Sequence, residues 1–289
     1  MTVAILGSTA IDTVAHRGQR VFKLGGVTTY SGMTYARHGV QCMLVTNVAD
    51  GDRRLLKPLT NENLILHLGK SRHTTHFVNH IEGDRRRQEM QAAADPIEWH
   101  QLAAVIGQVQ ILHLGPLHPK DIAHEVYRRL PTSDAVAVLD VQGMVRRVKN
   151  HQVYFDVSKH LPDALKACTI VKADEFELQS LKRFFKIRVP KLMTEFKIAE
   201  LVVTAGRKGG CVLTADGETV SYAAVPIQSV ADPTGAGDVF FASYVIGRLI
   251  RHLSVAKSCA DAAAVAAGLV EGKFILPQTL MLNPTGSSV

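Results

Sequence analysis

The sequence has few cysteines and no closely spaced pair of them, which excludes two classes of protein. The four cysteines lie far apart and show neither a CxxC motif nor a metal-ligand spacing. They are Cys42, Cys168, Cys211 and Cys259. A disulfide-rich scaffold and a zinc-binding domain are therefore excluded, and we expect reduced thiols in a cytoplasmic protein.

Long apolar runs are also absent. No stretch of 18 or more apolar residues occurs, so the sequence predicts no membrane-spanning helix. Residues 1–14 are apolar, but this segment is brief, lacks a basic leader and reaches Asp12 early, unlike a secretory signal peptide. Linkers, low-complexity tracts and repeats are missing too, so we expect residues 1–289 to form a single domain.

The charge balance is basic, with 33 Lys and Arg residues against 26 Asp and Glu, which gives a formal net charge of +7. Such an excess can attract nucleic acid, nucleotides or phosphorylated metabolites. The densest cluster, Arg85–Arg87, is a weak nucleic-acid signal, because no zinc finger or aromatic-interleaved RNA-binding pattern accompanies it. We therefore expect no nucleic-acid partner.

Six short apolar runs recur along the chain, and they are continuous rather than alternating. This pattern is typical of strands that are buried on both faces of a parallel sheet. The runs are 3–7, 42–48, 109–115, 135–141, 168–173 and 201–206. Helix-like segments follow at 28–39, at 95–107 with Asp95 as the expected N-cap, and at 118–130. Alternating strand and helix predicts an α/β fold with a mostly parallel sheet.

Two segments, 13–24 and 72–92, do not fit this alternation of buried strands and helices. Polar and apolar residues alternate in them around Gly18 and Gly83, which predicts half-exposed antiparallel strands. We expect these strands to pair as a small sheet that projects from the α/β body as a lid. A further hairpin is predicted at 209–225, where an Asp-Gly turn signal separates two apolar strands.

The stretch ADPTGAGD at residues 231–238 stands directly before a helix-like segment. The first N–H groups of a helix lack internal partners, and the helix dipole adds partial positive charge there. The amides of Gly235, Ala236 and Gly237 could therefore hold an anion such as a phosphoryl group. Asp238, in the first turn, could accept a proton from a substrate hydroxyl. The alternative is that this acid only complements the helix dipole.

Two other phosphate-binding motifs are excluded. The sequence contains no G-x-x-x-x-G-K-[ST], so it has no P-loop. The stretch GAGDVF lacks the third glycine of the dinucleotide fingerprint, and it does not fall in the first strand–turn–helix unit.

Several motifs, in the same order along the chain, resemble those of the PfkB (ribokinase-like) family of sugar and nucleoside kinases. DPTGAGD (232–238) is similar to the C-terminal signature, and LGGVTTYSGMTYARHG (24–39) to the N-terminal one, followed by VTNVADGD (45–52). VKADEFEL (171–178) resembles the N-x-x-E region, and VVTAGRKGG (202–210) the T-x-G-x-x-G region. The resemblance implies a ribokinase-like three-layer sandwich with a mostly parallel central sheet and a small β lid.

The resemblance also implies an ATP- and Mg²⁺-dependent kinase and a role for individual residues. Asp238 is the implied catalytic base, with the anion hole at Gly235, Ala236 and Gly237. The implied substrate-facing residues are Asp12, Gly25, Gly26 and Tyr30. Those along the ATP site are Thr204, Gly206 and Gly209. Asp174 and Glu177 are implied to organise Mg²⁺ through water.

This chain departs from the family pattern at two of these positions. Tyr30 stands where the family usually has the Asn that helps to define the sugar pocket, so ribose-type recognition is not assumed. Asp174 replaces the Asn of N-x-x-E, and a carboxylate can still bind magnesium-linked water.

The identity of the phosphate acceptor and the oligomeric state are indicated by resemblance to a subgroup and to family members, and by no signature motif. Segments 74–97 and 139–148 resemble a subgroup that includes inositol kinases, so a polyol or cyclitol acceptor is the leading hypothesis, with other sugars and nucleosides open. Family lids sometimes pair across a dimer, which allows a homodimer through the lid. Gln142 and Arg146 are singled out without a role.

A second hypothesis is a nucleotide-binding regulatory protein of the same fold that has lost turnover. The basic balance and Tyr30 allow it. The intact Asp238 and GAG turn argue against it, because binding alone does not require that acid.

Overall fold

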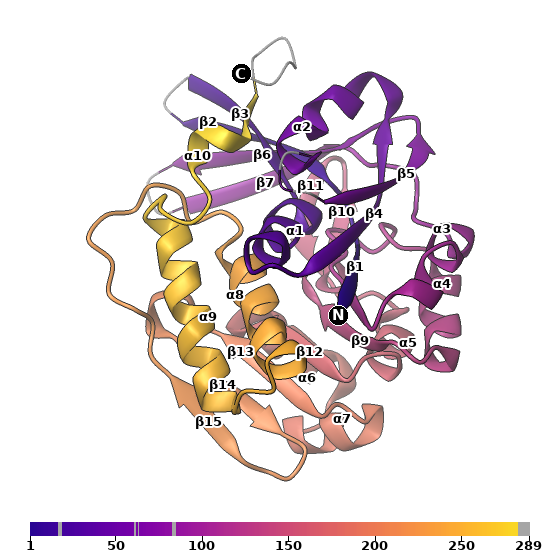
Figure 1. Ribbon diagram of the computed structural model, residues 1–289, viewed down its shortest axis with the longest axis vertical. Coiled ribbons are helices and arrows are strands. Elements are labelled where there is room, and N and C mark those ends of the chain that lie inside the picture. Colours follow the sequence, from indigo (N-terminus) through magenta and orange to yellow (C-terminus); the bar gives the residue numbers. More distant parts are fainter. Residues whose placement is uncertain (17–18, 61, 63, 83–84, 283–289) are drawn as a thin grey trace.

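The computed structural model describes residues 1–16, 19–60, 62, 64–82 and 85–282, and two β-sheets dominate it (Figure 1). The larger sheet has nine strands in the spatial order β15-β14-β13-β12-β9-β8-β1-β4-β5. These strands are β1 (Thr2–Leu6), β4 (Gln41–Ala49), β5 (Ile65–Ser71), β8 (Ile111–Leu114), β9 (Val136–Asp140), β12 (Ile170–Asp174), β13 (Glu200–Thr204), β14 (Gly210–Thr214) and β15 (Thr219–Tyr222). All pair in parallel except β14 and β15, which form the predicted hairpin. The mostly parallel sheet is therefore confirmed, and it takes in all six apolar runs.

Helices cover both faces of this sheet and make three layers (Figure 1). The first face carries α1 (Val27–Arg37), α8 (Ala236–Val245) and α9 (Val255–Val270). The second face carries α3 (Trp99–Ala103), α4 (His124–Arg129), α5 (Leu161–Lys166), α6 (Glu175–Phe185) and α7 (Val189–Phe196). The short helix α2 (Lys57–Thr60) also packs on the first face, where Leu59 belongs to the core. The short helix α10 (Pro277–Leu280) contacts β3 (Gln19–Gly25) of the smaller sheet. None of the helices described has both the length and the apolarity that a membrane span requires.

The period of two in the strands explains this layering. On β1, Val3 and Ile5 belong to the core beneath α1 and α8, whereas Ala4 and Leu6 belong to the core beneath α3 to α7. Successive side chains of a strand point to opposite faces. A strand between two helix layers must therefore be apolar at every position, as the continuous runs predicted.

The smaller sheet has seven strands in the order β10-β11-β7-β6-β2-β3-β16. They are β2 (Ala10–His16), β3 (Gln19–Gly25), β6 (Thr75–Glu82), β7 (Arg85–Ala92), β10 (Arg146–Lys149), β11 (Gln152–Phe155) and β16 (Met281–Leu282). The two predicted lid segments each form an antiparallel pair, but β2 and β6 join them in parallel. Gly18 and Gly83, predicted at their turns, lie outside the described residues. The division into one domain with an inserted lid stays a prediction.

The predicted helix over 95–107 is too long, because Asp95 has another partner. Its carboxylate accepts hydrogen bonds from the backbone and the side chain of Arg72, at 3.0 and 3.1 Å. The helix begins only at Trp99, where the Gln101 side chain accepts from the backbone N–H of Glu98 at 3.0 Å.

The predicted helix over 118–130 likewise starts late, at His124. The residues before it bend around Asp121, whose carboxylate accepts from the Ser8 hydroxyl at 2.6 Å and the Leu117 N–H at 2.8 Å. Satisfied side-chain bonds of this kind compete with helix formation. After α8, the chain continues as one π-helical turn over Ile246–Ile250.

Strand ends and one helix start converge at a single edge of the larger sheet. β9 ends at Asp140, β12 at Asp174 and β13 at Thr204. In open α/β sheets, ligands bind at the carboxyl ends of the parallel strands. A binding site is therefore expected where these three residues meet the first turn of α8.

Phe241 fixes α8 against the sheet and so controls where that first turn lies. It is fully buried, and its ring meets the edge of the His113 ring with 5.0 Å between centroids. Phe241→Ala should lower the free energy of unfolding by about 3–5 kcal/mol, because the cavity it leaves cannot collapse fully. Phe155→Ala, at an exposed position of β11, should change it by less than about 0.5 kcal/mol. Urea unfolding of both variants measures this, and equal losses would contradict the assignment.

Candidate active site

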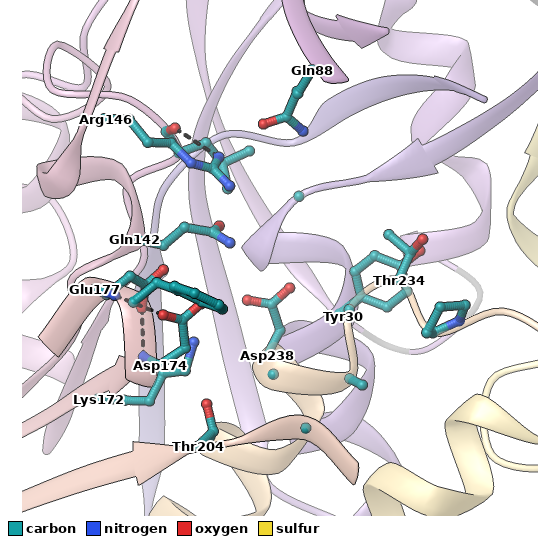
Figure 2. A pocket seen from close by; sticks show the side chains of 18 of the residues that line it. Tyr30, Gln88, Gln142, Arg146, Lys172, Asp174, Glu177, Thr204, Thr234 and Asp238 are labelled. Carbon is teal, nitrogen blue, oxygen red and sulfur yellow. Dashed lines mark hydrogen bonds between the residues drawn. The ribbon is translucent and has the colours of Figure 1, made fainter. Parts of the chain in front are cut away.

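A cavity of about 540 Å³ lies at this edge, and both sheets contribute to its wall. Eleven of the residues predicted from the sequence line it: Asp12, Gly26, Tyr30, Asp174, Glu177, Thr204, Gly206, Gly235, Ala236, Gly237 and Asp238. Gly25 and Gly209 do not form part of this wall. Figure 2 shows the Asp238 carboxylate at its centre, with Tyr30 and Thr234 on one side and Asp174 and Glu177 on the other.

The start of α8 presents open N–H groups to the cavity. Within the described chain, the N–H groups of Gly235, Gly237 and Asp238 find no protein acceptor, and that of Ala236 makes only a long bond of 3.3 Å to the Pro233 carbonyl. Open N–H groups at the positive end of a helix dipole favour an anion. The structure therefore supplies the geometry of the predicted anion hole.

Only glycine fits at position 235. Its φ of 81° lies in the left-handed region, which side chains with a Cβ rarely adopt. A Cβ there would also lie 2.3–2.5 Å from ring carbons of Tyr30. Tyr30, only 2% exposed, thus packs directly against the turn that leads into α8.

Asp12 reaches the cavity because its neighbour on the next strand has no side chain. Asp12 and Gly25 belong to the paired strands β2 and β3, and a Cβ on Gly25 would lie 2.0 Å from an Asp12 carboxylate oxygen. Gly25 therefore makes room for Asp12, although it does not line the cavity. Gly209 lies instead in the turn between β13 and β14, where its carbonyl accepts from the Ala205 N–H at 2.8 Å.

Asp174 and Glu177 form a capping box at the start of α6. Asp174 Oδ1 accepts from the Glu177 N–H, and Glu177 Oε2 accepts from the Asp174 N–H, both at 2.7 Å. One oxygen of each carboxylate is thus engaged in fixing the helix. Among the residues described, no cluster of three or more His, Cys, Asp or Glu side chains could hold a metal ion directly. The donor set fits a contact with Mg²⁺ through water rather than direct chelation.

Lys172 is a buried cation that the sequence analysis did not assign. It is 4% exposed, and its Nζ donates to Asp140 Oδ2 at 2.8 Å. A Cβ on Gly237 would lie 3.3 Å from this Nζ, so the ammonium lies beside the predicted anion hole. Burial lowers the pKa of Lys172, but the attraction of Asp140 and Glu177 outweighs this and raises it. The side chain therefore carries a fixed positive charge.

The environment of Asp238 sets its pKa near neutrality. Burial raises the pKa, and the negative charge of Asp140 raises it further. The positive charges of Lys172 and Arg146 lower it, and the balance leaves a pKa of about 7. A carboxylate with a pKa near the working pH is suited to general base catalysis. Burial likewise raises the pKa of Glu177 to about 7 against the opposing effect of Lys172.

Other wall residues receive no role from the sequence. They include Phe77, Gln88, Gln142, Arg146 and Phe176, which lie within segments 74–97, 139–148 and 171–178 that resemble family motifs. A lysine inside the apolar run CTIVKA was a signal for Lys172, because an unpaired charge is rarely buried in a strand. The side chains of Arg85 and Arg86 lie outside the described residues, and Arg87 is exposed and pairs with Glu89 at 2.9 Å.

Comparisons with known proteins bear on this site and on the fold. The model of the pfkB family of carbohydrate kinases matches residues 3–273. A cytidine kinase of Thermococcus kodakarensis is 21% identical over 258 residues, which are 86% of this chain and 88% of that protein.

Two solved structures illustrate the similarity in fold. A pyrophosphate-dependent kinase of the ribokinase family, complexed with a pyrophosphate analogue and myo-inositol, has a TM-score of 0.80 at 22% identity over 96% of each chain. Arabidopsis thaliana ribokinase, complexed with ribose and ATP, has a TM-score of 0.71 at 17% identity over 96% of this chain and 95% of that one. These likenesses confirm the ribokinase-like three-layer fold.

The raised pKa of Asp238 predicts a pH-dependent difference in stability between wild type and Asp238→Asn. The folded pKa is about 7 and the unfolded one about 3.9, so between them the unfolded state binds fewer protons and wild-type stability falls as pH rises. The variant lacks this titration. Its advantage in unfolding free energy should therefore grow by up to about 1.4 kcal/mol per pH unit until about pH 7, and then level off.

Urea unfolding of both proteins from about pH 5 to about pH 8 measures this difference. All other titrating groups are common to the two proteins, so their contributions largely cancel. A difference that does not change with pH would show that Asp238 titrates normally.

Proposed function

Because the chain belongs to the pfkB family of carbohydrate kinases, we propose that it transfers a phosphoryl group from ATP to a hydroxyl of a small polyol, sugar or nucleoside. One observation carries the proposal: the Asp238 carboxylate lies in the cavity beside the open amides at the start of α8. A base for the hydroxyl and a cradle for the phosphoryl group are thereby adjacent.

In the proposed reaction, Asp238 accepts the proton of the acceptor hydroxyl. The oxygen of that hydroxyl then forms a bond to the γ-phosphorus, and the bond from phosphorus to the bridging oxygen breaks. That oxygen keeps the electron pair, and ADP leaves. Asp12, on the opposite sheet, lies where it can hold a second hydroxyl and so orient the acceptor.

The transferred phosphoryl group is proposed to lie between the α8 amides and Lys172. Charge spreads over its equatorial oxygens in the transition state. The N–H groups of Gly235 and Gly237 face this position from one side, and the Lys172 ammonium lies beside Gly237. Fixed donors of this kind stabilise the developing charge without reorganising.

The nucleotide is proposed to extend past the ends of β12 and β13. Thr204 and Gly206 line that part of the cavity, and Gly209 shapes the following turn. Mg²⁺, when bound, neutralises charge on the nucleotide phosphates. Asp174 and Glu177 would hold it through water, each with the carboxylate oxygen that takes no part in the capping box.

The acceptor is proposed to be hydroxyl-rich, with a polyol or cyclitol first. Gln88 and Gln142 add amide groups to the wall that Asp12 and Arg146 also line, and such groups pair with hydroxyls. Tyr30 replaces the family's sugar-pocket Asn, and its bulk narrows the space beside the catalytic turn. Sugars and nucleosides are further candidates, because one similar structure is a ribokinase complexed with ribose and one relative is a cytidine kinase.

A screen of donors and acceptors tests the function. The purified protein with Mg²⁺ is incubated with ATP or inorganic pyrophosphate as donor, and with myo-inositol, another cyclitol, ribose or cytidine as acceptor. Pyrophosphate is included because one similar structure is that of a pyrophosphate-dependent kinase. We expect release of ADP that depends on one acceptor. Tight ATP binding by calorimetry without turnover on any acceptor would favour a nucleotide-binding regulatory protein instead.

Asp238→Asn should lower kcat by roughly 10²–10⁴-fold, because it removes the general base and retains the shape. The wild-type kcat/KM should fall as pH drops below about 7, the pKa of Asp238, and the residual rate of the variant should lose this dependence. Asp134→Asn, at an exposed position, is the matched control. Full turnover in Asp238→Asn would refute the assignment of the base.

Lys172→Met should lower kcat by about 10²–10³-fold, the cost of losing one donor to the transition state. Since the change leaves Asp140 unpaired, Lys172→Met/Asp140→Asn is measured with it to keep the buried charge balanced. Lys166→Met, exposed on α5, controls for loss of a lysine. If the folded double variant turns over like wild type, Lys172 has no contact with the phosphoryl group.

A further inference from the structure

A second ion pair, between a buried lysine and a half-buried aspartate, lies next to the catalytic turn. Lys23 Nζ donates to Asp232 Oδ2 at 2.5 Å. Lys23 is 5% exposed, although it belongs to a strand of the smaller sheet. Burial raises the pKa of Asp232, but Lys23 and the Thr234 N–H lower it below its ordinary value, so the carboxylate is ionised.

Asp232 shapes the turn that leads into α8. Its other oxygen, Oδ1, accepts from the Thr234 N–H at 2.9 Å. The next residue is Gly235, whose left-handed conformation directs the chain into the helix. One carboxylate therefore connects Lys23 to the backbone immediately before the open amides.

Lys23 is also coupled to the acceptor side of the cavity. Within the smaller sheet it pairs directly with Asp12 on β2, and with Met281 on β16 from the other side. Directly paired residues of antiparallel strands project to the same face. Lys23 therefore shares a sheet face with Asp12, the residue proposed to hold the acceptor.

We propose that Lys23 and Asp232 are a positioning pair that connects the smaller sheet to the phosphate-binding turn. The amides of Gly235 and Gly237 are aligned for transfer only while that sheet is in place over the cavity. An acceptor bound at Asp12 thereby completes the phosphate site. This inference rests on the proposed kinase function, because alignment of the turn matters only if a phosphoryl group is transferred there.

The test compares Lys23→Met, Asp232→Asn and the double variant with wild type. Within residues 234–238, hydrogen exchange of the Thr234 and Ala236 amides reports the order of the turn, because these two amides are hydrogen-bonded. The kcat and KM are measured with the acceptor from the screen. Both single changes should speed exchange in this segment and lower kcat by about 10–100-fold, with a smaller change in KM. The double variant should be no worse than Lys23→Met, because the two residues act as one unit.

The control is Lys257→Met, which breaks a surface pair with Asp261 on α9. It should leave exchange in 234–238 and kcat unchanged. Lys23→Arg, which keeps the charge, should retain most of the turnover. If Lys23→Met does not fold, Asp232→Asn carries the test, because its side-chain oxygen can still accept from Thr234.

Each outcome separates the inference from the proposed function. Wild-type exchange and kcat in a folded Lys23→Met, or a lower melting temperature with unchanged kcat, would overturn the positioning role and leave the kinase function standing. Absence of turnover in wild type would count against the kinase function. Hydrogen exchange in 234–238 would then be the measurement that shows whether Lys23 and Asp232 order the turn. Additive losses in the double variant would also overturn it, since independent residues are not a pair.

Discussion

The ion pair between Lys172 and Asp140 makes this site possible. The cavity brings several carboxylates close together, and the ammonium of Lys172 offsets part of their charge at the point where α8 begins. Without a buried cation, the negative charge of Asp140 would act unopposed on both Asp238 and Glu177, and these carboxylates would repel an incoming phosphate. With it, Asp238 keeps a pKa near neutrality and the amides beside it can accept an anion. The same arrangement, a base next to an anion cradle, is what hydroxyl phosphorylation requires.

The two sheets divide the work of the site. In the proposed reaction, the larger sheet and α8 provide fixed charges and amides for the phosphate, whereas the smaller sheet provides Asp12 and Gln88 for the acceptor. Contacts that cross between them, such as that of Lys23 with Asp232, make the two halves depend on each other. A kinase gains from this dependence, because phosphoryl transfer to water is disfavoured while the site is incomplete.

Much of the fold and part of the site could be predicted, because their signals are local. Continuous apolar runs mark strands between two helix layers, and all six lie in the larger sheet. The GAG turn and Asp238 are adjacent in sequence, so a single helix start determines their geometry. Residues that meet only through tertiary pairing gave no such signal. Gln88 comes from a strand whose pairing depends on the whole sheet, and Arg146 could be singled out but not given a role. Asp95 and Asp121 bond to distant partners, so the helices that follow them begin later than predicted.

A crystal structure with the acceptor from the screen and a non-hydrolysable ATP analogue tests the proposed site most directly. We expect an acceptor hydroxyl within about 3 Å of the Asp238 carboxylate, with the terminal phosphate against the amides of Gly235 and Gly237 and beside Lys172. An acceptor whose hydroxyls all lie out of hydrogen-bond reach of Asp238, with the phosphate on other groups, would contradict it.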